Sequence, residues 1–276
     1  MNILNKVVYS VFLSCAIVSC SEKSNHHQDV DEDGLLDEFT LRNAQVYTNL
    51  EEALREPEKV FVLNLKRKGL KELPDDFTKL RNIQSLTLRG NQFTKFPRQI
   101  FELKKLQYLD ISSNPFTEIP EEIGNFAYLH TLKLSFLNSS SLPRTIGKLE
   151  NLKILDLWVN KSLKALPAEI GNLMKLENLS ISESQLTELP EEIGKLTNLQ
   201  SLNLAKNEKL KVLPPTVTKL TQLRNLDLRE GKFEDIPREI TQLPNLKMVL
   251  MRGNPIHPNT REELQKTFSP QVIINF

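Results

Sequence analysis

Residues 106–126 read LQYLDISSNPFTEIPEEIGNF, and this pattern recurs along most of the chain. Its most constant feature is a proline that follows a leucine, isoleucine or phenylalanine. At the same position of the repeat this proline occurs eight times, at Pro74, Pro97, Pro120, Pro143, Pro167, Pro190, Pro214 and Pro237. Successive prolines are 23, 23, 23, 24, 23, 24 and 23 residues apart. A repeat of such constant length is typical of a chain built from stacked structural units.

Two hydrophobic periodicities alternate within each repeat. Leu109 and Ile111 are two residues apart, which is the period of a short strand. Ile123 and Phe126 are three apart, which suits a 3-10 turn. One repeat cannot bury its leucines alone, so neighbouring repeats are expected to stack into one core. Their strands would lie parallel and about 4.8 Å apart, which gives nine repeats a sheet of roughly 40 Å.

Written as L-x-x-L-x-L-x-x-N-x-L-x-x-L-P-x-x-I-x-x-L, the pattern resembles the signature of leucine-rich-repeat proteins over residues 60–256. Nine repeats of 23–24 residues begin at Val60, Ile83, Leu106, Leu129, Leu152, Leu176, Leu199, Leu223 and Leu246. The resemblance implies an α/β fold, a right-handed leucine-rich-repeat solenoid. A parallel sheet would form the concave face and short 3-10 or helical segments the convex face.

Helical caps are expected at both ends, because an open terminal repeat exposes its core. We predict an N-terminal cap helix within residues 43–59, capped by Asn49. Residues 257–276 predict a C-terminal helix capped by Asn259, followed by a strand. The sequence before the first repeat and the C-terminal tail also resemble leptospiral leucine-rich-repeat lipoproteins.

An asparagine follows the predicted strand in five repeats, at Asn91, Asn114, Asn160, Asn207 and Asn254. In the family it resembles, this buried amide bonds to backbone groups of the bend. Lys68, Leu137, Ser184 and Gly231 replace it in the other repeats. Because Leu137 has no amide, we predict that the fourth repeat is locally irregular and that Asn138 slips into its position.

The first residues predict an export signal. An apolar run of 12 residues, from Val7 to Val18, follows Lys6. As a helix it spans about 18 Å, short of the roughly 30 Å core of a bilayer. The run ends in Ser19-Cys20, which resembles a bacterial lipoprotein signal. The resemblance implies removal of residues 1–19, lipidation of Cys20, and an anchor in the bacterial envelope, in the outer membrane and facing either side. An ordinary signal peptide cut near the same place is the alternative.

Residues 20–42 form an acidic segment with two interpretations. Asp29, Asp31, Asp33 and Asp37 are spaced like the ligands of a calcium loop, with Gly34 at the sharp turn. Thr40 stands where such a loop has a bidentate glutamate. The alternative is an acidic tether between the lipid and the solenoid.

Large side chains cluster at positions that the strand pleat directs to the concave face. Most concave positions are small or polar, but repeats three to five differ. We predict a protein-binding patch made of Tyr108, Asp110, Lys133, Phe136, Ile154, Asp156, Trp158 and Val159. The alternative is that Phe136 and Val159 repair packing near Leu137. A second group, Arg229 and Arg252 with nearby acids, is interpreted as a solvated mixed-charge surface.

Charge and motifs narrow the function. Residues 43–276 carry 33 bases and 28 acids, an excess too small to predict nucleic-acid binding. No phosphate-binding glycine loop, Cys-x-x-Cys, His-Glu-x-x-His or Gly-x-Ser-x-Gly motif occurs, so we expect no enzyme and no small-molecule substrate. Calcium is the one cofactor considered. The sequence favours an envelope protein that binds a protein ligand, of which a host protein is one candidate; the alternative is a self-associating envelope scaffold.

Overall fold

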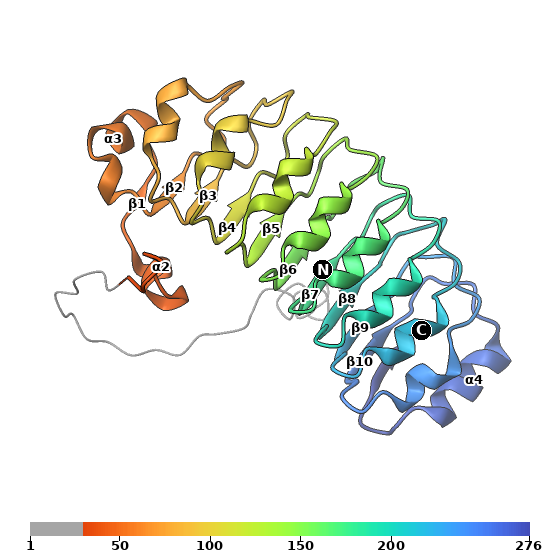
Figure 1. The fold of residues 1–276 in the computed structure, drawn as a ribbon. Helices are drawn as coiled ribbons and strands as arrows, with labels where there is room; N and C mark the ends of the chain where they lie inside the picture. Colours follow the sequence, from red (N-terminus) through yellow and green to blue (C-terminus); the bar gives the residue numbers. More distant parts are fainter. Residues whose placement is uncertain (1–29) are drawn as a thin grey trace.

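The computed structural model describes residues 30–276, and these form one curved parallel sheet with its strands in chain order (Figure 1). The strands are β1 Val46–Tyr47, β2 Val62–Asn64, β3 Ser85–Thr87, β4 Tyr108–Asp110, β5 Thr131–Lys133, β6 Ile154–Asp156, β7 Asn178–Ser180, β8 Ser201–Asn203, β9 Asn225–Asp227, β10 Met248–Leu250 and β11 Ile273–Asn275. The 3-10 helices are η1 Pro57–Lys59, η2 Asp75–Lys79, η3 Arg98–Glu102, η4 Glu121–Asn125, η5 Arg144–Lys148, η6 Ala168–Asn172, η7 Glu191–Lys195, η8 Pro215–Lys219 and η9 Arg238–Gln242. The α-helices are α2 Glu38–Asn43, α3 Leu50–Arg55 and α4 Pro258–Thr267.

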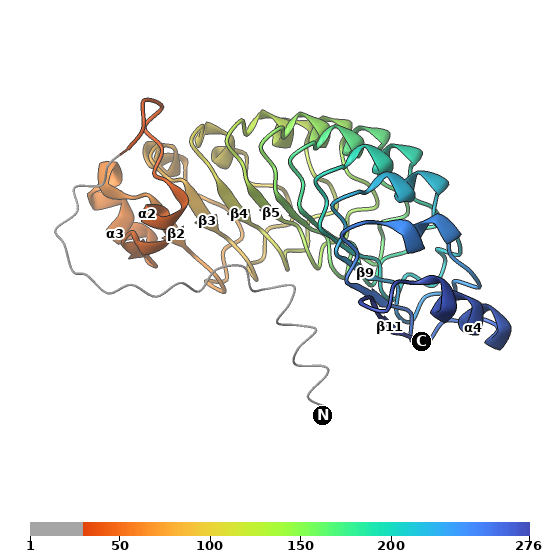
Figure 2. The same ribbon diagram turned by 90° about the horizontal axis from the view of Figure 1, so that it is seen from below.

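Each predicted repeat start lies two residues before a strand, from β2 to β10. Equivalent residues of neighbouring repeats pair in register, as Leu86, Leu109 and Leu132 do. The 3-10 helices line the outer side of the sheet, and Figure 2 shows their row from another direction. Since a 3-10 helix is wider than a strand, this arrangement curves the sheet towards its strands. The fold is the predicted leucine-rich-repeat solenoid.

One hydrophobic core runs the length of the solenoid. Buried side chains from Tyr47 to Phe268 form a single cluster, and the repeated leucines are almost fully buried. Phe96, Phe101, Phe116 and Phe126 add aromatic contacts near the third repeat, with ring centres 5.3–5.7 Å apart. The described part of the chain is therefore stabilised by stacking of its repeats.

The asparagine ladder corrects the prediction for the fourth repeat. Asn160 Nδ2 donates to the carbonyl of its own repeat, Leu157, and to that of the previous repeat, Leu134, both at 2.9 Å. The other four asparagines do the same. Each amide thus serves two repeats, so asparagine is needed only in every second one.

The predicted irregularity is therefore wrong. The Leu134 carbonyl of the fourth repeat accepts its hydrogen bond from Asn160, and the Leu137 N–H donates to the same side chain at 2.8 Å. Leu137 itself is buried, and Asn138 remains exposed instead of taking its place. Strand β5 and helix η5 of this repeat have the same lengths as their neighbours.

Four glycines let the 3-10 helices of adjacent repeats approach closely. They are Gly124, Gly147, Gly171 and Gly194. A Cβ atom on any of them would lie 2.4 or 2.5 Å from a backbone oxygen of the next repeat. Phe101 occupies the equivalent position in η3 and stacks between Phe96 and Phe126. The glycines therefore set the tightest stacking in the middle of the convex face.

The two ends are closed by helices and strands. Asn49 caps α3 as predicted, accepting hydrogen bonds from the N–H groups of Glu51 and Glu52. At the other end, Asn259 is not the cap. Helix α4 begins at Pro258, and the Nδ1 atom of His257 accepts from the Asn259 N–H at 3.2 Å. Strand β11 then pairs with β10 and ends the sheet.

Part of the predicted tether is folded against the solenoid. Residues 30–43, the N-terminal strap, form a tight turn at Gly34 and helix α2. Leu36 is buried; its N–H donates to Gln84 Oε1 and its carbonyl accepts from Gln107 Nε2, each at 2.8 Å. These glutamines immediately precede β3 and β4, so the strap lies on the side of the solenoid where strands begin.

The remainder of the predicted N-terminal features, Cys20 and the signal segment, lies outside the described residues. Within residues 30–276, no helix is both long and apolar enough to cross a membrane.

Candidate functional site

Two aromatic side chains, Phe136 and Trp158, are in contact just after the strands of repeats four and five. The rings of Phe136 and Trp158 meet edge to face with centres 5.0 Å apart. Phe136 is 40% exposed, and Trp158 is half-buried. The Phe136 N–H also donates to the Trp158 carbonyl at 2.9 Å, which fixes the two residues relative to each other. The structure thus brings together two of the predicted patch residues in a partly exposed position.

Phe136 and Val159 both lie in left-handed turns of the backbone. Both have positive φ, 56° and 57°, as does the equivalent residue of every repeat from Arg67 to Gly253. This left-handed conformation favours glycine and is strained for a β-branched side chain such as Val159. Neither side chain is fully buried. Both side chains therefore leave apolar area that a partner could cover.

The charged residues of the patch occupy one row across three adjacent strands. Asp110, Lys133 and Asp156 are register partners in β4, β5 and β6. Lys133 Nζ lies 5.5 Å from the centre of the Tyr108 ring. Burial raises the pKa of the Tyr108 phenol above its usual 10.0, and Lys133 partly opposes this shift. The Lys133 ammonium and the Tyr108 ring are therefore adjacent, and together they present a positive charge beside an aromatic surface.

Asp110 is less available than predicted. It is 5% exposed, and its Oδ1 accepts from the Ser112 N–H at 3.0 Å. Concave curvature crowds the inner side chains, so a position that the pleat directs inward is not always open to solvent. Asp156 is more accessible but also constrained, since its Oδ1 accepts hydrogen bonds from Ser135 Oγ at 2.8 Å and the Trp158 N–H at 3.1 Å.

A hollow of about 340 Å³ adjoins the patch on its C-terminal side. Ile154, Asp156 and Trp158 line its near wall. Its other lining residues come mainly from β7, β8 and the turns after them, and include Asn178, Ser180, Ser182, Ser201, Asn203 and Ala205. Sequence reasoning missed this extension. The available signal was the run of small polar residues at concave positions, which leaves space beside a large tryptophan.

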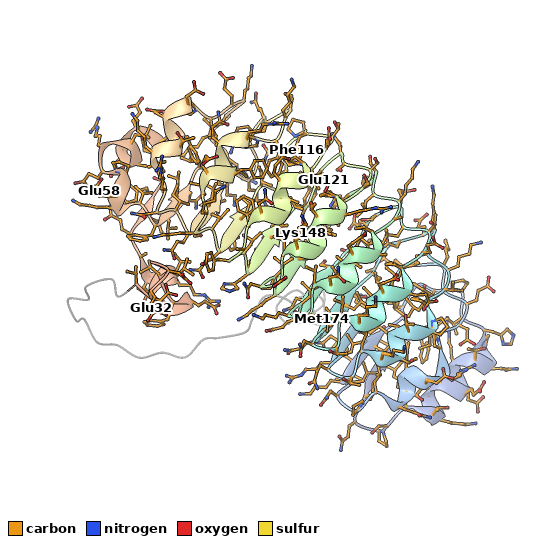
Figure 3. All side chains as sticks on the ribbon, in the orientation of Figure 1. Glu32, Glu58, Phe116, Glu121, Lys148 and Met174 are labelled. Atoms are coloured by element: carbon orange, nitrogen blue, oxygen red, sulfur yellow. The ribbon has the colours of Figure 1, made fainter. Side chains whose placement is uncertain are left out.

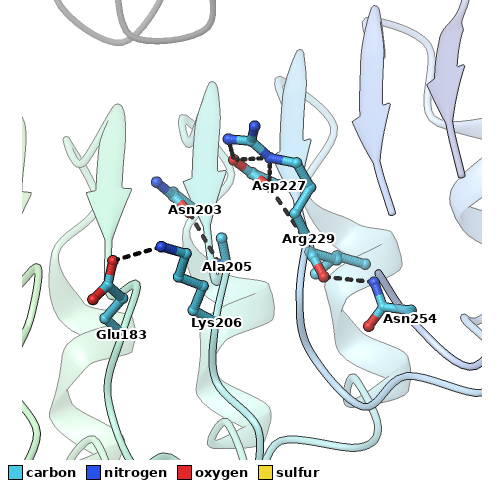
Figure 4. Close-up of polar contacts among 8 residues, drawn as sticks. Glu183, Asn203, Ala205, Lys206, Asp227, Arg229 and Asn254 are labelled. Atoms are coloured by element: carbon cyan, nitrogen blue, oxygen red, sulfur yellow. Dashed lines mark hydrogen bonds and ion pairs between the residues drawn. The ribbon is translucent and has the colours of Figure 1, made fainter. Parts of the chain in front are cut away.

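Glu183, Lys206 and Arg229, which also line the hollow, form ion pairs. Figure 4 shows these contacts. Arg229 binds Asp227 through two nitrogens, at 2.6 and 2.9 Å, and the Asp227 side chain is only 1% exposed. Lys206 Nζ lies 3.0 Å from Glu183 Oε1 in the adjacent turns. The interpretation of this region as a solvated mixed-charge surface is therefore wrong for Asp227, because curvature buries the carboxylate beneath its arginine.

The predicted calcium ligands have local roles in the strap. Asp31 Oδ1 accepts from the N–H groups of Asp33 and Leu35, and Asp37 caps α2. The hydrogen bond from Thr40 Oγ1, with those from the Thr40 and Phe39 N–H groups, lowers the pKa of the Asp37 carboxyl. Asp29 lies outside the described residues. Within residues 30–276, no group of three or more acidic, histidine or cysteine side chains is placed to hold a metal. Calcium binding stays a prediction.

Comparisons with known proteins agree with the geometry. Family models described as leucine-rich repeat and leucine-rich repeat region match residues 58–116, 105–187 and 168–267. No curated protein sequence matches this chain.

Solved structures are similar to this chain, and two of them share its fold with TM-scores above 0.5. A leucine-rich-repeat protein of Leptospira interrogans is 23% identical, with 84% of this chain and all of that one covered, at a TM-score of 0.40. The functional domain of InlJ from Listeria monocytogenes is 22% identical over 74% of this chain, at 0.59. The Arabidopsis receptor kinase HAESA, in complex with the peptide hormone IDA and the co-receptor SERK1, is 25% identical over 87%, at 0.65. This chain spans 41% of the InlJ chain and 40% of the HAESA chain. The matched models cover most of the sequence, and the chain belongs to the leucine-rich-repeat family.

Proposed function

We propose that this protein is an envelope-anchored binding module that captures a protein partner on its concave face. The observation that carries this proposal is the Phe136–Trp158 pair beside the 340 Å³ hollow. A partly exposed aromatic pair next to an open concavity offers a partner apolar area to bury, and fixed hydrogen bonds reduce the entropy lost on binding.

The floor of the hollow supplies polar contacts. Ser201 is 4% exposed, and its Oγ has no hydrogen-bond partner among the described residues. A buried hydroxyl without a partner is costly, so a ligand group that reaches it gains more than an exposed contact would. Asn178 and Asn203 provide further amides along the same wall. This combination suits an extended segment with an apolar side chain for Trp158 and a main chain that bonds to the floor.

The comparison with HAESA supports this choice, because its structure holds a peptide hormone and shares the fold over most of this chain. Repeat chains of this family are typically interaction modules, which favours binding over catalysis. The anchor follows from the Ser19-Cys20 resemblance: acylation of Cys20 would hold the solenoid on the bacterial envelope. A host protein is one class of ligand that such a location would allow.

The test is affinity capture with the mature chain, residues 20–276. Trp158→Ala should lose the captured protein, while Val212→Ala, which removes an exposed side chain elsewhere, should retain it. Both variants must unfold at the wild-type temperature. Equal capture by both variants, or capture of further copies of the chain only, would contradict the concave site. Loss of lipid labelling in Cys20→Ala checks the anchor separately.

A further inference from the structure

The segments that connect each 3-10 helix to the next strand are unusually basic. These eight links comprise residues 79–84, 102–107, 125–130, 148–153, 172–177, 195–200, 219–224 and 242–247. They contain eleven bases, Lys79, Arg81, Lys104, Lys105, Lys148, Lys153, Lys175, Lys195, Lys219, Arg224 and Lys247. They contain three acids, Glu102, Glu150 and Glu177. The links therefore contain eight more bases than acids.

The remainder of the solenoid shows the opposite balance. Residues 43–276 hold 33 bases and 28 acids, so subtracting the links leaves 22 bases and 25 acids. The modest positive charge of the whole chain therefore conceals a concentration on one side. Because the strands are parallel and in chain order, all eight links lie on the same flank of the solenoid, the one where strands begin.

The bases on this flank are accessible. Nine of the eleven are exposed, and Lys105 and Lys153 are partly buried. Among the residues that the structure describes, only Lys79 of the eleven forms an ion pair, with its Nζ 4.0 Å from Asp76. Solvated lysines that are not neutralised by neighbouring acids retain their charge for a partner.

The acidic strap occupies one end of the same flank. It docks on Gln84 and Gln107, and the Lys105 ammonium lies against Gly34 of its turn. The flank beyond the strap, residues 148–153, 172–177, 195–200, 219–224 and 242–247, is here called the basic flank. It has seven bases and two acids. Met174, half-exposed, adds an apolar side chain. Figure 3 shows Met174 and the strap residue Glu32 at the same edge of the curved molecule.

The described residues also begin on this side of the solenoid. Val30 begins the strap, and the ten residues from Cys20 can reach at most about 36 Å. An acyl group on Cys20 would therefore keep the strap, and the flank that continues beyond it, within reach of the membrane. Of the anionic partners that lysines bind, the bilayer is the one that this connection brings near.

We infer that the basic flank is a membrane-contact surface that binds anionic phospholipid headgroups, with Met174 entering the headgroup region. The choice of the bilayer as the anionic partner rests on the proposed function, which places a lipid anchor on Cys20. A polybasic surface adds an electrostatic attachment to the lipid anchor and determines which side of the solenoid faces the bilayer. With the flank on the membrane, the strand-end side that carries Phe136 and Trp158 would face away from the lipid.

The test uses the mature chain, residues 20–276, with Cys20→Ser, so that the flank alone can bind. Vesicles of phosphatidylcholine with phosphatidylglycerol should bind it, and pure phosphatidylcholine vesicles should not. The triple variant Lys195→Glu, Lys219→Glu, Arg224→Glu should bind at least about 100-fold more weakly. A matched control, Lys161→Glu, Lys164→Glu, Lys211→Glu, changes the net charge equally in the turns after the strands and should keep most of the binding.

Circular dichroism must show that both triple variants are folded. If the glutamate variant unfolds, the corresponding glutamine variant should still weaken binding, by a smaller factor. Absence of vesicle binding, equal loss in both triple variants, or binding to soluble heparin without vesicle binding would each overturn the inference. Because acylation and Trp158 play no part in this assay, its failure is distinguishable from failure of the proposed function.

Discussion

Asn160 should be one of the most costly polar residues to remove, although it is not in the candidate site. Its amide satisfies three backbone groups, the Leu134 and Leu157 carbonyls and the Leu137 N–H, at 2.8–2.9 Å. Position 137 carries leucine, so no second asparagine serves the Leu134 carbonyl. Each buried group left without a partner costs about 1–3 kcal/mol, so the loss of three partners in Asn160→Ala should lower the free energy of unfolding by at least about 3 kcal/mol.

The neighbouring exposed residue provides the control. Asn138→Ala removes the same side chain from a position outside the ladder and should cost about 0.5 kcal/mol or less. Urea unfolding followed by Trp158 fluorescence and by circular dichroism measures both values.

A rescue experiment separates the ladder from simple loss of packing. In the Leu137→Asn background, a second amide stands next to the Leu134 carbonyl, so Asn160→Ala should cost about 1–3 kcal/mol less than in the wild type. If Asn160→Ala is no more harmful than Asn138→Ala, or if Leu137→Asn gives no rescue, the two-repeat ladder is wrong.

Three further predictions follow from the same geometry. Gly147→Ala should destabilise the protein by about 1–3 kcal/mol, because its Cβ would lie 2.5 Å from the Glu169 oxygen; Thr218→Ala, at the equivalent position of η8, should be tolerated in the same thermal unfolding assay. Val159→Asn should raise stability by about 1 kcal/mol in urea titration, because asparagine tolerates the left-handed backbone; an unchanged midpoint would show that the valine is unstrained. The pKa of His130 is lowered below 6.5, chiefly because the imidazole is partly buried. As the pH decreases through about 6.5, the unfolded state therefore binds a proton before the folded state does, and the free energy of unfolding falls. His130→Gln should therefore lose less stability than the wild type when the pH is lowered from about 7.5 to about 5, as measured by urea unfolding.

The fold was predictable because its determinants are local and repeated. Each L-x-L pair sets a strand, each I-x-x-L sets a 3-10 turn, and the spacing allows no other register. Asn49 was predictable as a cap because its side chain acts on the next two or three residues. The error at Asn259 was avoidable, since proline prefers the first helical position and Pro258 thereby makes His257 the cap.

Features that depend on contacts between distant residues were not predictable. Nothing local to Leu36 indicates that it is buried against Gln84 and Gln107, so the sequence does not predict that the strap packs on the solenoid. The hollow depends on curvature and on residues from five repeats. The aromatic pair was predictable as residues on a common face, but its edge-to-face contact and its partial exposure depend on the left-handed turns that position Phe136.

The sharing of one amide between two coils has a consequence for how the molecule opens. When Asn207 leaves its place, the carbonyls of Ile181 and Leu204 lose their donor together, so the smallest cooperative unit in the C-terminal half is a pair of coils. Amide hydrogen exchange should then show protection changing in steps of two repeats from the C-terminus. In the second and third repeats, where Asn91 and Asn114 both donate to the Leu88 carbonyl, the doubled bond should make those coils the last to exchange.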